Sequence, residues 1–175
     1  MSAGPVSAGP VSDGPVSDGH ADPDRVGPAA RAEAAELLAR YAELVDAGDF
    51  DGVGALLSDA ELLEAGGARV AAGAEEIADL YAATTRRHGD GTPGTAHVIT
   101  NVIVEAVPGS DQLEVRSRFT VFQAVEGFPL QPVVVGRYVD RMRRVDGRLR
   151  FVRRTMVPER WGDPTHHLTF DPRPS

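Results

Sequence analysis

Asp46 and His97 are the two residues whose types best suit acid–base chemistry in this sequence. An aspartate that accepts a hydrogen bond from one imidazole nitrogen fixes the tautomer of a histidine and leaves the other nitrogen to take up a proton. In an apolar pocket, such a pair would remove a proton from a carbon acid or protonate a leaving group. The alternative is that Asp46 caps or solvates a helix end and that His97 is a hydrogen-bonded core histidine.

The segment around His97 has the pattern of a strand. Residues 95–107 alternate, are rich in β-branched types and follow a turn at Pro93-Gly94. Alternation predicts that Asn101 shares a face with His97, together with Ile99 and Ile103. We therefore expect Asn101 to donate to a ligand oxygen at another level of a cavity, or else to bond to backbone near the end of the strand.

Other side chains are candidates for binding a substrate. Tyr41, Tyr81 and Phe119 fit either the core or the wall of a cavity. Residues 137–154 hold the densest positive charge, and Arg137 could bind a carboxylate or enolate ligand there. The alternative for this cluster is an exposed sheet face that pairs with the acidic residues of another subunit.

The remaining histidines carry weaker signals. His166 and His167 with Asp163 suggest a metal site, but adjacent residues in an irregular segment rarely chelate one ion, so we expect no metal. His88 is expected to interact with the dipole at a helix end. His20 falls in a repetitive tail, where solvation is expected.

Helical patterns precede a run of strand patterns. Helices are predicted from Pro28 to about Gly48, over 50–57 and over 74–88. Short extended pieces are predicted around 59–67 and 69–71, then long strands over 95–107, 112–125, 132–144 and 149–157, with a C-terminal extension after Pro158. This order predicts an α+β fold in which the helices cover one face of a curved, mostly antiparallel sheet around a cone-shaped cavity.

Length and composition set the outer limits. We expect a Ser/Gly/Pro repeat tail over 1–27 that is disordered, one domain over 28–170 and a short tail over 171–175. The net charge of −8 argues against nucleic-acid binding, and no apolar run approaches the roughly 20 residues that span a bilayer. The sequence lacks cysteine and a secretory signal pattern, so we expect a cytoplasmic protein. All 18 basic residues are arginines, which excludes a Schiff-base lysine.

Three segments together resemble a known family. They are VDAGDF after the first helix, HVITNVIVE in the strand of His97, and GRYVDRMRRVDGRLRF followed by WGDPTHHL. Over residues 31–168 the chain is similar to the SnoaL-like branch of the nuclear transport factor 2-like superfamily. The resemblance implies a cone-shaped α+β barrel of three N-terminal helices packed on a strongly curved sheet. This branch includes polyketide cyclases, isomerases, dehydratases, dehydrochlorinases and non-catalytic members.

The resemblance also bears on the site. In the scytalone dehydratase and dehydrochlorinase types, the matching positions are Asp46 and His97. The chain departs from both types, because it lacks the dehydrochlorinase lysine and has Arg116 and Arg118 on the strand where scytalone dehydratases carry a second histidine. Val45, not a tyrosine, precedes Asp46. Neither specific reaction follows from the resemblance.

These observations predict a small cofactor-independent enzyme of the lyase or isomerase kind. It would dehydrate, isomerise or cyclise a small apolar substrate of polyketide, terpenoid or aromatic type, and form a homodimer. Two alternatives remain. One is a non-catalytic subunit resembling the β-subunit of a ring-hydroxylating dioxygenase, and the other is a ligand-binding homodimer.

Overall fold

The computed structural model describes residues 26–173, so the predicted repeat tail lies, up to residue 25, outside the described residues. The elements follow the predicted order. They are α1 (Pro28–Asp46), α2 (Phe50–Leu56), β1 (Glu61–Leu63), β2 (Arg69–Ala72), α3 (Gly73–Thr84), β3 (Thr95–Ala106), β4 (Gln112–Val125), β5 (Phe128–Val145) and β6 (Arg148–Trp161). Among the described helices, none is long and apolar enough to cross a membrane.

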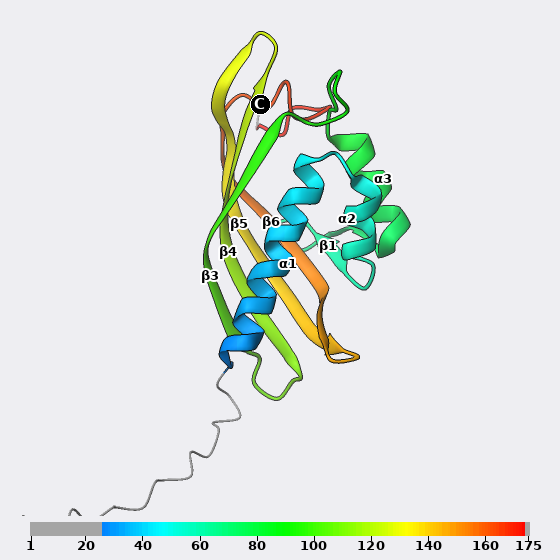
Figure 1. Ribbon diagram of the computed structural model, residues 1–175, viewed down its shortest axis with the longest axis vertical. Helices are drawn as coiled ribbons and strands as arrows, with labels where there is room; N and C mark the ends of the chain where they lie inside the picture. Colours follow the sequence, from blue (N-terminus) through cyan, green and yellow to red (C-terminus); the bar gives the residue numbers. More distant parts are fainter. Residues whose placement is uncertain (1–25, 174–175) are drawn as a thin grey trace, which may run out of the picture.

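One sheet forms the wall of the molecule, and the helices cover one of its faces. The strand order is β2-β1-β6-β5-β4-β3, antiparallel except where β1 pairs with β6. The long strands curve, α1 lies along their inner face, and α2 and α3 pack on the same side (Figure 1). The predicted α+β architecture, with three helices on a curved, mostly antiparallel sheet, is confirmed.

Local signals explain the elements that hold the site. In α1, Leu38, Tyr41 and Val45 recur at helical spacing and are all buried against the sheet. The carboxylate of Asp49 caps α2 by accepting from the backbone N–H of Gly52 at 2.9 Å. The tight turn between β5 and β6 has positive φ angles at Asp146 and Gly147, which is the geometry of a two-residue hairpin.

Several predicted boundaries are wrong. The strand predicted over 132–144 begins earlier, at Phe128, and the piece predicted around 59–67 is a strand only over Glu61–Leu63. The third helix does not reach His88, since Thr85 has an extended backbone and bridges to Leu168. The last strand does not end at Val157 but continues through Pro158 to Trp161. The β5–β6 register shifts beside Gly136, the partner of Pro158, and such irregularities are where a sheet tolerates proline.

A bulge in β3 changes which of its residues face inward. The β3–β4 register shifts between Thr100 and Ile103, and Asn101 has a φ of 54°. Beyond the bulge, Val104 is buried and Ile103 is exposed, the reverse of simple alternation. The predicted shared face of His97, Asn101 and Ile103 is therefore wrong after Thr100.

Candidate active site

Asp46 and His97 meet where the end of α1 crosses the start of β3. The Nδ1 of His97 lies 2.5 Å from Oδ1 of Asp46, and the backbone N–H of His97 donates to Oδ2 at 2.8 Å. The hydroxyl of Thr95 donates to Oδ1 at 2.7 Å. Three donors from one strand thus hold the carboxylate, so the orientation of the His97 ring is fixed by the sheet itself.

The charge of this pair follows from its surroundings. Burial alone would raise the pKa of Asp46, but the hydrogen bonds and charge of His97, with the Thr95 hydroxyl, outweigh it and the pKa is lowered. Asp46 is therefore ionised at neutral pH. Because an ionised carboxylate only accepts, Nδ1 of His97 is the donor, which leaves Nε2 as the nitrogen that can exchange a proton with a ligand.

His97 stands between Asp46 and a cavity of about 490 Å³. His97 lines this cavity, whereas Asp46 faces a second hollow of about 400 Å³ between α1 and β3. The side chain of His97 is 5% exposed and that of Asp46 is 24% exposed. A ligand in the larger cavity would therefore touch the imidazole, and the carboxylate would act through it.

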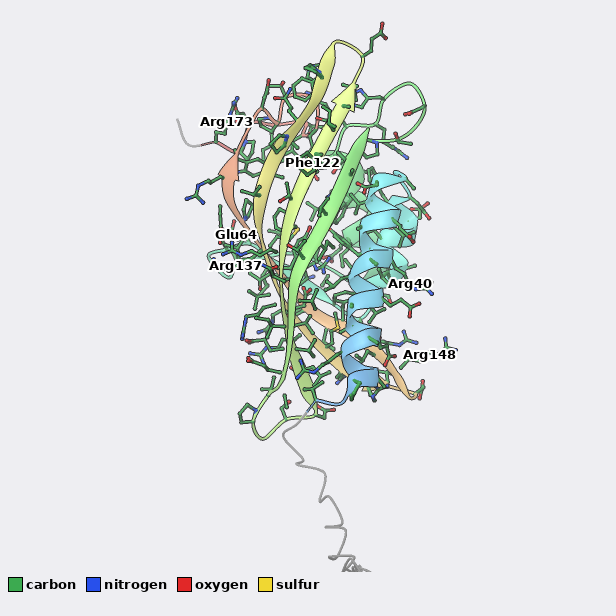
Figure 2. The ribbon with its side chains drawn as sticks, turned by 60° about the vertical axis from the view of Figure 1, so that its left-hand side comes forward. Arg40, Glu64, Phe122, Arg137, Arg148 and Arg173 are labelled. Carbon is green, nitrogen blue, oxygen red and sulfur yellow. The ribbon has the colours of Figure 1, made fainter. Side chains whose placement is uncertain are left out.

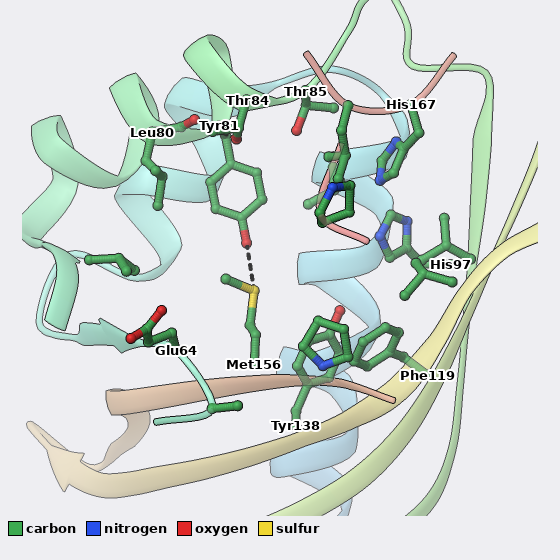
Figure 3. Close-up of a pocket in the computed structure, with 18 of the residues that line it drawn as sticks. Glu64, Leu80, Tyr81, Thr84, Thr85, His97, Phe119, Tyr138, Met156 and His167 are labelled. Atoms are coloured by element: carbon green, nitrogen blue, oxygen red, sulfur yellow. Dashed lines mark hydrogen bonds between the residues drawn. The ribbon is translucent and has the colours of Figure 1, made fainter. Parts of the chain in front are cut away.

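The larger cavity is mostly apolar, with a few polar groups (Figure 3). Aliphatic and aromatic side chains supply much of its wall, among them Leu80, Val121, Val134, Met156 and Trp161. Apolar walls with a few convergent polar groups are typical of small-molecule sites.

The predicted aromatic residues lie in this wall. Tyr41, Tyr81 and Phe119 all line the cavity. The hydroxyls of Tyr41 and Tyr81 are hydrogen-bonded at 2.7 Å, and Tyr81 also contacts the sulfur of Met156. Burial, followed by the neighbouring Tyr41, raises the pKa of Tyr81 well above its usual value, so its hydroxyl stays protonated.

A buried ion pair lies behind the tyrosines. Arg154 donates to both oxygens of Asp140, at 2.9 and 2.8 Å, and both side chains are fully buried. Its guanidinium packs over the rings of Tyr41 and Tyr138, at 4.0 and 4.2 Å from their centroids. Burial would lower the pKa of Arg154, but Asp140 outweighs it, so the pKa is raised and the pair is ionic. No local sequence pattern marks this pair, because only the register of β5 and β6 brings Asp140 and Arg154 together.

Two predicted binding residues lie outside the cavity. Asn101 is exposed in the β3 bulge, and Arg137 pairs with Glu159 at 2.5 Å on the outer face of the sheet. Figure 2 shows Arg137 on the side away from α1. Alternation along β5 turns Tyr138 inward and Arg137 outward, so its predicted contact with a cavity ligand is wrong. The exposed-face alternative fits better, with partners in the same chain.

The cavity also holds a histidine that was not predicted to line it. His167, in the irregular segment after β6, lines the cavity with its ring centroid 6.5 Å from that of His97. No periodicity marks an irregular segment, so no sequence signal could have found this placement. Neighbouring His166 instead packs on Phe128, and its carbonyl accepts a hydrogen bond from His88, which corrects the predicted helix-end role of His88.

In residues 26–173, no group of three or more His, Cys, Asp or Glu side chains is arranged to hold a metal ion.

Comparisons with known proteins agree with the fold. The model of the SnoaL-like domain matches residues 29–155. A nuclear transport factor 2-like protein of Novosphingobium aromaticivorans with a cystatin-like fold is 30% identical, with a TM-score of 0.58 over 73% of this chain and 80% of that one. No curated protein matches the chain.

Two further structures from Novosphingobium aromaticivorans show the same fold at lower identity. A candidate scytalone dehydratase is 20% identical, with a TM-score of 0.60 over 77% of this chain and 87% of that one. The β-subunit of a candidate aromatic-ring-hydroxylating dioxygenase is 19% identical, with a TM-score of 0.60 over 77% and 92%. Because the SnoaL-like model spans most of the chain and the 30% identical structure shares its fold, the protein belongs to the SnoaL-like family of the nuclear transport factor 2-like superfamily.

Proposed function

We propose that the protein is a cofactor-independent enzyme that uses His97 as its general base and acid. The observation that carries this proposal is the position of His97, with Nδ1 on the Asp46 carboxylate and its ring in the wall of the 490 Å³ cavity. Asp46 is the orienting partner, and it stabilises the imidazolium that forms during the reaction. This division of roles requires no metal or cofactor.

The proposed step begins with proton transfer from carbon. Nε2 of His97 takes a proton from a carbon next to a substrate carbonyl, and the C–H electron pair moves into the carbonyl to give an enolate. The imidazolium then returns its proton. Delivery to another carbon completes an isomerisation, whereas delivery to a departing β-hydroxyl releases water and completes a dehydration.

The cavity indicates the class of substrate. Its walls are largely aliphatic and aromatic, and the buried cation near them, Arg154, is neutralised by Asp140. Burying an unpaired charge there would be costly. A neutral compound of one to three rings, of polyketide, terpenoid or aromatic type, therefore fits best.

The proposal can be tested with 5-nitrobenzisoxazole, a small aromatic compound that opens when a base removes its ring proton. We expect His97→Gln to lower kcat/KM by about 100-fold or more, the usual contribution of a general base. Asp46→Asn should also lower it, because an amide cannot hold the ring in the same protonation state. Circular dichroism should show both variants folded, and unchanged rates in both would refute the proposal.

A second candidate is a non-catalytic role, which the likeness to a dioxygenase β-subunit favours. In that case the cavity would bind aromatic compounds, yet opening of 5-nitrobenzisoxazole would not depend on His97. A neighbouring gene for a dioxygenase α-subunit would support this candidate. The homodimer expected from the sequence remains a prediction, which light scattering at micromolar concentration would test.

A further inference from the structure

His167 is a second histidine in the cavity, and the proposed mechanism does not use it. His167 is buried, with 7% of the residue exposed. Its ring lies edge-on to that of His97, with 66° between the ring planes and 6.5 Å between the ring centroids (Figure 3). The two imidazoles are therefore neighbours in the cavity wall, so that one ligand in the cavity can contact both rings.

The backbone around His167 is held on both sides. Its carbonyl accepts from the backbone N–H of Arg86 at 2.8 Å, and the neighbouring Leu168 bridges to Thr85. The carbonyl of His166 accepts from the buried side chain of Gln123 at 2.9 Å. The segment after β6 is thus fixed to the end of α3 and to β4, and a side chain on such a support keeps a defined orientation.

The two ring nitrogens of His167 differ in their surroundings. Nδ1 is fully buried and has no hydrogen-bond partner among the described residues. His167 lines the cavity, so with Nδ1 buried we take the Nε2 edge of the ring as the one that faces a ligand. A buried N–H without an acceptor is rarer than a buried acceptor without a donor, which favours the tautomer with its proton on Nε2.

The ring is neutral at physiological pH. Burial, followed by the charge of His97, lowers the pKa of His167 to about 4, although the charge of Asp46 acts in the opposite direction. A neutral imidazole with its proton on Nε2 donates a hydrogen bond without giving up the proton. In triosephosphate isomerase, a neutral histidine polarises the substrate carbonyl in the same way.

We propose that His167 binds the carbonyl oxygen of the substrate through Nε2–H, beside the proton acceptor His97. This inference rests on the proposed function and adds the residue that stabilises the enolate. When His97 takes the carbon proton, negative charge develops on the carbonyl oxygen, and the hydrogen bond from His167 strengthens. His167 transfers no proton in this step.

The test uses a pair of probes that differ in one acceptor atom. 2-Acetylnaphthalene carries a carbonyl, whereas 2-isopropenylnaphthalene has a CH₂ group in place of its oxygen. Trp161 lines the cavity, so its fluorescence reports binding of both. We expect the wild-type protein to bind the ketone about tenfold more tightly, the effect of one hydrogen bond in a dry site. The infrared carbonyl band of the bound ketone should shift to lower frequency.

Three variants locate the donor. His167→Leu should abolish the preference and the infrared shift while the alkene still binds, and His167→Gln should restore part of both because its amide donates from a similar position. His166→Leu is the matched control, since its ring packs outside the cavity on Phe128, and it should keep the wild-type preference. An undiminished preference in His167→Leu, or none in the wild-type protein, would overturn the inference.

The probes also separate this inference from the proposed function. Opening of 5-nitrobenzisoxazole depends on a base, whereas ketone binding depends on a donor. If the preference for the ketone depends on His167 but the rate of ring opening does not depend on His97, the inference is upheld and the proposed enzymatic function is refuted. If the rate depends on His97 but His167→Leu keeps the preference for the ketone, the proposed function is upheld and the inference is refuted.

Discussion

The two faces of β4, β5 and β6 carry the same chemical partners in opposite surroundings. On the inner face, Arg154 and Asp140 form one pair, fully buried and packed among aromatic rings. On the outer face, Arg118 and Arg137 share Glu159, and their side chains are about half exposed. The sequence marks residues 137–154 as the densest positive charge and does not separate Arg137 from Arg154, yet it is the pair of Arg154 that lies beside the cavity.

This difference shows that burial, not charge density, gives an ion pair its importance. An exposed pair gains little because water screens it and because both long side chains lose freedom. In a buried pair each charge depends on the other, since neither can be solvated once its partner is removed. We therefore expect the same substitution to have very different effects on the two faces.

The largest effect is expected from Arg154→Met. The change leaves the Asp140 carboxylate buried without its partner and removes the cation from the rings of Tyr41 and Tyr138. We expect the free energy of unfolding, measured with urea, to fall by about 3–5 kcal/mol. The double variant Arg154→Met with Asp140→Leu should recover most of this loss, because apolar side chains of similar volume need no partner. If Arg154→Met alone is as stable as the wild-type protein, the buried pair matters no more to stability than the exposed pairs do.

The pH dependence of stability should show a second inner-face effect. His167 has a pKa of about 4 in the folded chain and about 6.5 when unfolded. Between these values the unfolded chain binds a proton that the folded chain does not, so stability falls as the pH drops from 6.5 to 4. We expect this site to remove about 3 kcal/mol over that range.

Urea unfolding of His167→Gln at a series of pH values tests this contribution. The variant should lose most of the slope between pH 6.5 and 4, while His166→Gln should retain it. Asp46 does not confuse the result, since its lowered pKa places its own loss of stability below this window. An equal slope in His167→Gln and the wild-type protein would contradict the buried, neutral state of this ring.

The sequence was sufficient for the periodic parts of the chain. The bounds of β4 were predicted correctly, and α1 begins at the predicted Pro28 and ends two residues before the predicted Gly48. The contact between Asp46 and His97 was also predicted, because the family resemblance assigns one residue to the end of the first helix and the other to the start of a strand.

The failures share a cause, which is that they depend on geometry between distant residues. One extra residue in the β3 bulge turned Asn101 away, and nothing in the local pattern marks it. Asp140 and Arg154 meet only through the register of two strands, and His167 reaches the cavity through contacts of an irregular segment with α3. Alternation alone assigns faces but cannot assign partners.

A smaller inner-face effect is expected from Gly136→Ala. A Cβ at Gly136 would lie 2.4 Å from the carbonyl oxygen of Val157 and 2.6 Å from the ring of Phe119, which stacks on Tyr138. We expect a loss of about 1–3 kcal/mol in the free energy of unfolding and weaker binding of 2-acetylnaphthalene, because the ring must move. Gly66→Ala is the control, since its Cβ would meet nothing closer than 3.6 Å. Unaltered stability and binding in Gly136→Ala would mean that the ring of Phe119 can move without cost to the fold or the cavity.

The smallest effect is expected on the outer face, from Arg137→Ala. Its side chain is 48% exposed and pairs with Glu159, which keeps Arg118 as a second partner. Because the remaining pair and water both compensate, the free energy of unfolding should change by less than about 1 kcal/mol. The rate of 5-nitrobenzisoxazole opening should stay at its wild-type value, because Arg137 lies across the sheet from the cavity. A loss as large as that of Arg154→Met would show that the outer network stabilises the sheet as strongly as the buried pair. A loss of rate without a loss of stability would instead indicate that Arg137 takes part in the active site, contrary to its position on the outer face.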